Sequence, residues 1–283
     1  MRTLADKNAI VTGGARGVGR AITERFIKDG AKVLICSRSI EELKKTSKEI
    51  DPSGKSLSFL EADVSNYKEC QKLFAYAKKI FKTLDILVNN AGIYGPIGLS
   101  ETNPPKDWLK TIEINLMGTV YCTQLALGQM KHQKHGKIIN LAGAGVGGKK
   151  PLSRFSAYYT SKAAVAAYTE VVSNEAIDYN IQVNCISPGA INTYFTDYLI
   201  AHGPEKAGPM YEQALKQKEG GGDSPELGAN LVSFLASDQS NNVTGKILSA
   251  KWDKINLLKK LSPEDLNKYT LRRIDEELFG EKR

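Results

Sequence analysis

Histidine and cysteine are scarce in this chain, and their spacing argues against metal chemistry. The 283 residues include three histidines and four cysteines. They are His132, His135, His202, Cys36, Cys70, Cys122 and Cys185. Because none of them has thiolate, imidazole or carboxylate companions at ligand spacing, we expect no metal site. A chain of this length needs no disulfide framework, so the cysteines are expected to be reduced structural thiols.

Long apolar runs are also absent. The longest, around residues 85–88, are the size of a strand and far short of the ~20 residues that span a bilayer. The chain opens MRTLADK and runs directly into an apolar segment, without the pattern of a signal peptide. We therefore expect a cytoplasmic protein with no membrane segment.

The sequence has no aromatic-basic platform and no recognition-helix pattern, although its net charge is +8. Its lysines alternate with acidic residues along stretches such as 41–48, which is typical of a solvated helix face. The modest basic excess suits a phosphate-rich cofactor equally well. We expect no nucleic-acid partner.

What the chain does contain is a regular alternation of two kinds of segment. β-branched runs predict strands at 8–12, 32–36, 56–60, 85–89, 137–141 and 181–186. Amphipathic stretches predict helices at 20–29, 40–50, 67–81, 105–131, 157–179 and 225–236. Alternation with nearly continuous apolar strands predicts an α/β fold, a doubly wound parallel sheet (Rossmann fold), in one domain over residues 1–250.

Residues 193–223 interrupt this alternation with Gly-Pro pairs and a run of three glycines. An irregular insert after a late strand lies at the carboxyl edge of the sheet, where ligands bind. We interpret it as a substrate lid carrying Tyr194, Phe195 and Tyr198, with a mobile surface loop as the alternative. Residues 251–283 form a charged extension whose helical pattern over 263–279 suits packing on a neighbouring subunit.

A glycine-rich turn joins the first predicted strand to the first helix. It reads TGGARGVG over residues 12–19, with Gly13, Gly17 and Gly19 interleaved by Ala15, Arg16 and Val18. Glycines allow a tight turn and let backbone N–H groups approach a pyrophosphate at a helix N-terminus. The turn predicts a dinucleotide site.

The end of the second predicted strand indicates which dinucleotide. An NAD site needs a carboxylate there for the ribose hydroxyls. The chain instead reads Cys36-Ser37-Arg38-Ser39, so Arg38 and Arg16 offer guanidinium groups to a 2′-phosphate, and Ser37 or Ser39 could add a hydroxyl. We predict NADP(H), with NAD(H) still possible if both arginines are simply surface residues.

Tyr158 and Lys162 are four residues apart in a predicted helix and therefore share one face. A nearby positive charge favours the phenolate of a tyrosine, which suits it to general acid–base work. The same spacing is common by chance, so it indicates little alone.

Together these segments resemble the short-chain dehydrogenase/reductase family over about residues 5–250. The matching pieces are Thr12 to Gly19, Asp63-Val64, Asn89 to Gly92, Asn115, Tyr158 with Lys162, and Ser187-Pro188-Gly189 leading to Thr193. The resemblance implies hydride transfer between NADP(H) and a carbonyl or secondary alcohol, in a homodimer or homotetramer.

The resemblance also implies roles for individual residues. Asp63 and Val64 would lie along the adenine, and Asn90, Ala91 and Gly92 beneath the cofactor. The nicotinamide end would be held by Pro188, Gly189, Ile191 and Thr193. Lys162 would bind the nicotinamide ribose, and Asn115 would anchor a water in a proton relay.

One departure from the family bears on catalysis. The resemblance implies a serine just past the strand at 137–141, but the chain reads Ala142-Gly143-Ala144-Gly145 and has no hydroxyl before Ser153. Losing such an oxygen donor costs about 10²–10³ in rate. Ser153 or Ser156 could replace it, or backbone N–H groups of residues 143–145 could, and Ser156 could instead cap its helix. Otherwise the chain is impaired, and the rival interpretation is a nicotinamide-binding scaffold or redox sensor.

Overall fold

The computed structural model describes residues 2–143, 145–147 and 152–271. Seven strands in this part of the chain form one parallel sheet in the order β3-β2-β1-β4-β5-β6-β7. The strands are β1 (Asn8–Thr12), β2 (Lys32–Ser37), β3 (Leu57–Glu61), β4 (Ile86–Asn89), β5 (Gly136–Leu141), β6 (Ile181–Ser187) and β7 (Ile247–Ser249). The predicted doubly wound α/β fold is confirmed, and β7 is the one strand that the sequence pattern missed.

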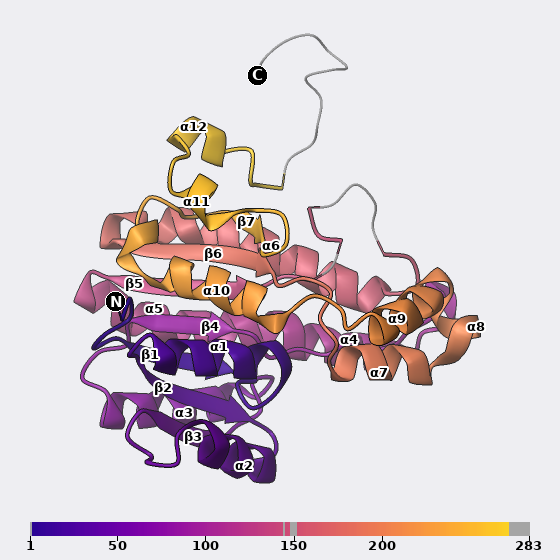
Figure 1. Cartoon of the computed structure of the whole chain (residues 1–283), viewed down its shortest axis with the longest axis horizontal. Coiled ribbons are helices and arrows are strands. Elements are labelled where there is room, and N and C mark those ends of the chain that lie inside the picture. Colours follow the sequence, from indigo (N-terminus) through magenta and orange to yellow (C-terminus); the bar gives the residue numbers. More distant parts are fainter. Residues whose placement is uncertain (1, 144, 148–151, 272–283) are drawn as a thin grey trace.

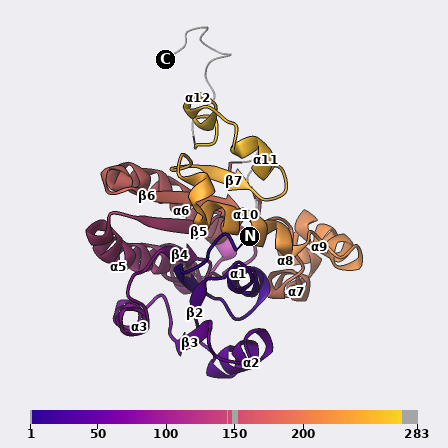
Figure 2. The same ribbon diagram turned by 60° about the vertical axis from the view of Figure 1, so that its left-hand side comes forward.

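Helices cover both faces of the sheet. The first six are α1 (Gly17–Lys28), α2 (Ile40–Ile50), α3 (Tyr67–Ile80), α4 (Pro105–Ile112), α5 (Gly118–Gln133) and α6 (Ser156–Ala176). The others are α7 (Tyr194–Ala201), α8 (Gly203–Ala207), α9 (Pro209–Glu219), α10 (Pro225–Ala236), α11 (Ile255–Leu258) and α12 (Pro263–Leu266). Figure 2 shows α3, α5 and α6 on one side of the sheet and α1 and α10 on the other.

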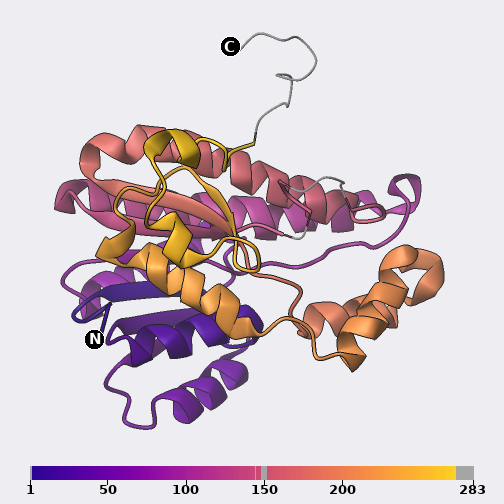
Figure 3. The same cartoon turned by 45° about the horizontal axis from the view of Figure 1, so that its top comes forward.

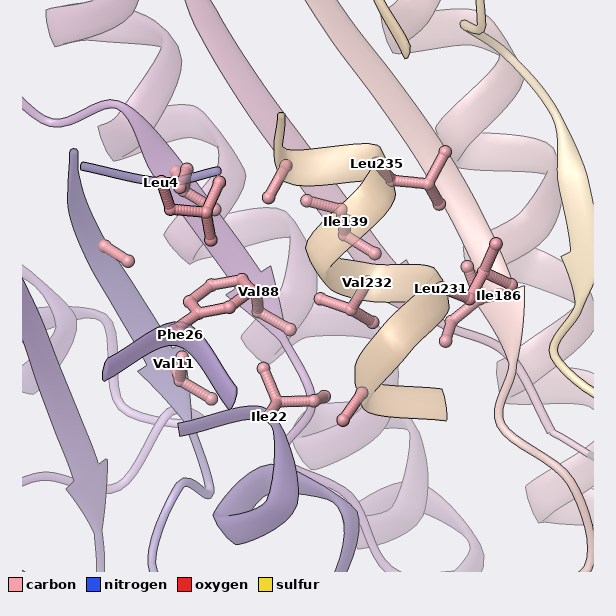
Figure 4. Close-up of a cluster of buried hydrophobic side chains, with 14 of the residues drawn as sticks. Leu4, Val11, Ile22, Phe26, Val88, Ile139, Ile186, Leu231, Val232 and Leu235 are labelled. Atoms are coloured by element: carbon pink, nitrogen blue, oxygen red, sulfur yellow. The ribbon is translucent and has the colours of Figure 1, made fainter. Parts of the chain in front are cut away.

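The core between α1, α10 and the sheet fixes the first helix against the strands. Ile22 and Phe26 of α1 meet Val232 of α10 over the middle of the sheet (Figure 4). All three side chains are fully buried. Burying one such side chain contributes about 1.5–3 kcal/mol. The turn that joins β1 to α1 is therefore anchored at both ends.

The helix predicted over 105–131 contains an interruption. A π-helical turn, η2 (Glu113–Met117), separates α4 from α5. Such a turn inserts one residue into the helical ladder and is frequent at functional sites. It carries Asn115, so this candidate residue lies at the irregular point of the helix.

The lid segment, residues 193–223, folds into α7, α8 and α9, which stand apart from the sheet beyond its carboxyl edge (Figures 1 and 3). Its two ends are joined at the base. The Asp223 N–H donates to the Ala190 carbonyl, and the Ala190 N–H donates to Asp223 Oδ2, each at 2.8 Å. Lys251 Nζ lies 2.9 Å from the other carboxylate oxygen, Asp223 Oδ1.

The residues after β7 pack on the chain's own core. Leu258 and Leu266 are buried in the same cluster as α1 and α10, and the Ile247 N–H donates to the Tyr269 carbonyl at 2.8 Å. The helix predicted over 263–279 is wrong in length, because α12 ends at Leu266. Residues 272–279 lie outside the described part of the chain.

Candidate active site

The glycine turn after β1 is as tight as its sequence requires. Gly13 and Gly17 have φ of +64° and +54°, which side chains rarely adopt. A Cβ added at Gly19 would lie 2.2 Å from the Gly13 carbonyl oxygen. Helix α1 has no side-chain cap, and the backbone N–H groups of residues 15–19 find no acceptor among the described residues. These donors form a cradle for an anion.

The residues expected to bind a 2′-phosphate differ in the contacts that they make with other side chains. Arg38 is exposed and has no ion pair with a described residue. Arg16 lies 3.4 Å from Glu42 Oε1, and its guanidinium carbon is 4.9 Å from the ring centre of Tyr194. Ser37 Oγ donates to the Ser39 carbonyl at 3.1 Å. Of these two arginines, Arg38 is thus the one that no described carboxylate holds.

The ends of β1 and β4 meet where the strand order reverses. Thr12 Oγ1 accepts from the N–H groups of Asn90 and Ala91 at 3.0 and 3.1 Å, and Asn90 Nδ2 donates to the Thr12 carbonyl at 2.9 Å. Near the end of β3, Asp63 Oδ1 accepts from the Ser65 backbone and hydroxyl, while Val64 is buried. In a doubly wound sheet a dinucleotide binds across this reversal.

The three candidate catalytic residues are all buried, and two of them, Asn115 and Lys162, meet beside Gly92. Tyr158, Lys162 and Asn115 are 8%, 4% and 0% exposed. A Cβ added at Gly92 would lie 3.1 Å from Asn115 Oδ1 and 3.4 Å from Lys162 Nζ. The ammonium donates to the Leu141 carbonyl at 2.8 Å.

Asn115 is held by three hydrogen bonds. Its Oδ1 accepts from the Ile93 N–H at 2.8 Å, and its Nδ2 donates to the Ile93 carbonyl and to Ser161 Oγ, each at 2.9 Å. The π-helical turn therefore joins the loop after β4 to helix α6. Asn115 fixes the position of α6 and hence of Tyr158.

Burial shifts the titration of the two ionisable groups in opposite directions. It raises the pKa of Tyr158, with repulsion from Tyr94 as a second cause. It lowers the pKa of Lys162 to about 8. Both shifts follow because a buried site disfavours the charged form. The phenol therefore carries its proton at neutral pH.

The residues after β6 lie against the glycine turn. Gly189, which follows Pro188, has φ of +105°. Thr193 Oγ1 caps α7 by accepting from the Phe195 N–H at 3.2 Å, and its Cγ2 would lie 3.3 Å from a Cβ at Gly17. Ile191 is buried at the lid base, where it pairs with Gly222. The lid therefore starts at the glycine turn.

The two candidate replacement serines are not brought to Tyr158 by any recorded hydrogen bond. Ser153 is exposed. Ser156 Oγ lies 3.3 Å from Trp108 Nε1 and 3.5 Å from Asn103 Nδ2, on the side of α4. The prediction that Ser156 caps its helix is wrong, because α6 begins at Ser156 and has no side-chain cap.

Comparison with known proteins assigns the chain to a family. Residues 7–202 match the short chain dehydrogenase family. The chain is a short-chain dehydrogenase. It is 34% identical to the NAD-dependent glycerol dehydrogenase of Listeria innocua over 246 residues, 87% of this chain and 92% of the relative.

Two solved structures with the same fold contain different nucleotides. NAD⁺-bound xylitol dehydrogenase is 27% identical with a TM-score of 0.79, covering 87% of this chain and 98% of the other. A single-residue variant of actinorhodin polyketide ketoreductase with NADPH is 29% identical with a TM-score of 0.78, covering 86% and 95%. Such enzymes act on small molecules with a nicotinamide dinucleotide.

An aromatic cluster surrounds Tyr158 in this dehydrogenase. Tyr94 packs edge-on against Tyr158, Phe155 and Phe195, with ring centres 4.8, 5.3 and 4.5 Å apart. Phe195 comes from α7, so the segment over residues 193–223 contacts the rings of Tyr94 and Tyr158. Sequence reasoning missed Tyr94 and Phe155, since single aromatics in loops carry no periodic signal.

A pocket of about 600 Å³ adjoins this cluster in the dehydrogenase. The loop after β4, helix α4 and the lid form the walls of the pocket. Ile97 and Tyr198 line it and also belong to the hydrophobic cluster that contains the four aromatic rings. Tyr198 donates to the Gly95 carbonyl at 3.3 Å. The charged residues that line the pocket are Asp107, Lys110, Arg154, Glu205 and Lys206.

The described residues of the dehydrogenase hold no group of three or more histidine, cysteine or carboxylate side chains arranged for a metal ion. None of their helices combines the length and the apolar character that crossing a membrane requires.

Proposed function

We propose that this dehydrogenase is an NADP(H)-dependent ketoreductase or alcohol dehydrogenase in which Tyr158 transfers the proton. One observation carries the proposal: a protonated, buried phenol stands one helical turn from the Lys162 ammonium, beside Gly143 in the segment that follows β5. Proton transfer by a positioned side chain contributes about 10²–10⁴ in rate. The substrate class is a carbonyl compound or secondary alcohol.

The residues present fit a nicotinamide dinucleotide. The free N–H groups of residues 15–19 suit its pyrophosphate, and the absence of side chains at Gly13 and Gly19 lets the turn pack tightly on itself and on Asn90. Asp63, Val64 and Asn90 to Gly92 line the adenine and central parts in this proposal, with Pro188 to Thr193 at the nicotinamide. Bound NADP(H) supplies or accepts the hydride.

The remaining chemistry falls to the chain's own side chains. In the direction of reduction, Tyr158 gives its Oη proton to the substrate oxygen as that oxygen gains negative charge. Lys162 Nζ stabilises the phenolate that remains, because a nearby cation favours the charged form. Asn115 holds α6 in register through Ser161 and the Ile93 backbone, so the phenol stays aimed at one position.

The NADP preference is supported by the charge at the end of β2. Arg38 is exposed and free of an ion pair among the described residues. The two nearest carboxylates in the sequence are engaged: Glu41 accepts from Ser39 Oγ at 3.1 Å, and Glu42 faces Arg16. A 2′-phosphate would therefore meet a cation, whereas the two ribose hydroxyls of NAD lack a carboxylate partner.

We also propose a homo-oligomer and a cytoplasmic location. Leu109 of α4, Val171 of α6 and Ile177 are more than half exposed, which suits a contact between copies through these helices. The four cysteines are free, and Cys122 Sγ donates a hydrogen bond to Cys70 Sγ at 3.9 Å rather than forming a disulfide with it, as suits a reducing compartment. Light scattering of the purified chain distinguishes a monomer from a dimer or tetramer.

A rival function, nucleotide binding without turnover, is favoured by two observations. Lid and loop aromatics cover Tyr158 so that 8% of it is exposed, and the position after β5 offers no hydroxyl. Both functions require NADP(H) binding. They differ in whether a carbonyl substrate is reduced.

Incubation with NADPH and a carbonyl panel separates them. Diacetyl, glyceraldehyde and trifluoroacetophenone serve as probes, and loss of nicotinamide absorbance is the readout. We expect turnover that falls by at least ~10² in Tyr158→Phe, while the NADPH dissociation constant is retained. Turnover equal to the blank without enzyme on every probe contradicts the enzyme function for that panel.

A further inference from the structure

A second phenol lies beside Tyr158, and no role has been given to it. Tyr94 follows the Asn90 to Gly92 segment and sits at the centre of the aromatic cluster. Its ring meets the Tyr158 ring edge-on, with centres 4.8 Å apart and an interplanar angle of 81°. Phe155 and Phe195 pack on other parts of the same ring. The ring is thus fixed on three sides.

The hydroxyl of Tyr94 is not used within the fold. It makes no recorded hydrogen bond to another described residue. Among these residues, Asn89 Oδ1 is the only enclosed side-chain oxygen or nitrogen without a partner, so Tyr94 Oη is not sealed off. Ile93 and Gly95, on either side of Tyr94, line the pocket of about 600 Å³. Tyr94 therefore belongs to the loop that borders the pocket, and its ring packs against Tyr158.

The segment after β5 lacks a side-chain hydroxyl that could donate to a substrate oxygen. The serine implied just after β5 is absent, and Ser153 and Ser156 make no recorded contact with Tyr158. A tyrosine hydroxyl has the required O–H group. Burial raises the pKa of Tyr94 to about 12, so this hydroxyl keeps its proton across the neutral range.

We propose that Tyr94 Oη donates a hydrogen bond to the same substrate oxygen that Tyr158 protonates, and so replaces the missing serine. This inference rests on the proposed ketoreductase function. In reduction, the carbonyl π pair moves to oxygen as the hydride adds to carbon, and that oxygen takes the Tyr158 proton. Tyr94 keeps its own proton throughout, so the step needs no further reactant.

The test is Tyr94→Phe, which removes one oxygen and retains the ring contacts. With diacetyl and trifluoroacetophenone as probes, we expect kcat to fall by about 10²–10³, because the donor acts on charge that develops in the transition state. KM is expected to change by no more than a few-fold. Tyr121→Phe is the matched control: it removes a phenol hydroxyl from α5, where Tyr121 packs on Tyr67, and should leave kcat unchanged.

The outcomes are distinguishable. Wild-type kcat in Tyr94→Phe, with Tyr158→Phe inactive, overturns the role of Tyr94 and leaves the proposed function standing. A raised KM at unchanged kcat also overturns the role of Tyr94 as a donor, since that result means that Tyr94 only contacts the bound substrate as an apolar side chain. No turnover by the unaltered chain overturns both. An unchanged NADPH dissociation constant in Tyr94→Phe shows that the variant is folded.

Discussion

A methyl group added to Gly143 would lie 2.6 Å from the phenol oxygen of Tyr158. The phenol therefore fills the space that a side chain at position 143 would occupy. Position 143 falls within the segment after β5 where the family resemblance implies a serine. The ring of Tyr158 therefore occupies the space beside the backbone at position 143.

This relationship predicts that restoring a side chain is harmful. Gly143→Ala and Gly143→Ser should each lower the free energy of unfolding by about 1–3 kcal/mol, because extra atoms must be fitted beside a buried ring. Both should also lower kcat/KM with diacetyl, since the phenol must move away. Denaturant unfolding and steady-state rates test this. The ratio of the serine to the alanine variant isolates the added hydroxyl.

One result contradicts this account of position 143. If Gly143→Ser turns over faster than the unaltered chain and unfolds at the same denaturant concentration, the phenol moves freely. The close approach in the structure would then not restrain Tyr158.

Arg38 should set the cofactor preference. Arg38→Ala is expected to raise the NADPH dissociation constant by about 10–100-fold, because a hydrogen bond to a charged group contributes about 1.5–3 kcal/mol. The NADH dissociation constant should stay the same. Fluorescence titration of both nucleotides measures the effect, and Lys48→Ala, an exposed cation on α2, is the control. Equal loss of both nucleotides refutes a 2′-phosphate contact.

The fold was predictable because its signal is local and repeated. β1, α2 and α10 have the predicted bounds, since each follows a regular apolar period; in the structure Ser39 Oγ caps α2 by accepting from the Glu42 N–H, and Ser224 Oγ caps α10 by accepting from the Glu226 N–H. β7 was missed because it is three residues long and two of them are only partly buried. The continuation of the core into residues 251–271 was missed because isolated leucines in a charged segment give no periodic pattern.

The candidate site was predictable only where its residues form a motif. The glycine turn and the pair Tyr158 and Lys162 have fixed spacing along the chain. The contact between Tyr94 and Tyr158 joins residues 64 positions apart and depends on how loops pack. The same holds for the Asp223 contacts at the base of the lid, whose partners Ala190 and Lys251 are distant in sequence.

Those contacts predict a specific effect on lid motion. Asp223→Asn removes the ion pair with Lys251 and weakens the acceptor for the Ala190 N–H, so hydrogen exchange over residues 194–219 should become faster. Asp197→Asn removes the exposed ion pair with Lys218, 2.6 Å long, within the lid and should change exchange little. Mass spectrometry of exchanged peptides compares them. Equal exchange in both variants shows that the base does not restrain the lid.

A buried lysine at the opposite edge of the sheet predicts a pH dependence of stability. Lys137 is 7% exposed and lies beside a pocket of about 200 Å³ with Lys7, Asp85 and His135. Its Nζ donates to Asn241 Oδ1 at 2.6 Å. Burial is the largest cause lowering its pKa from 10.5 to about 8, Lys7 lowers it further, and Asp238 opposes this.

Between about pH 8 and 10.5 the unfolded chain therefore binds more protons at Lys137 than the folded chain does, so this residue's contribution to stability rises with pH. Lys137→Met removes that contribution. Relative to the variant, the unaltered chain should gain on the order of 2 kcal/mol in free energy of unfolding from about pH 8 to about pH 10. Urea unfolding of both chains across this range measures the gain, and other titrating groups cancel in the difference. Lys32→Met, at an exposed position, should give a constant difference, and parallel curves for Lys137→Met would show that the buried amine is not discharged on folding.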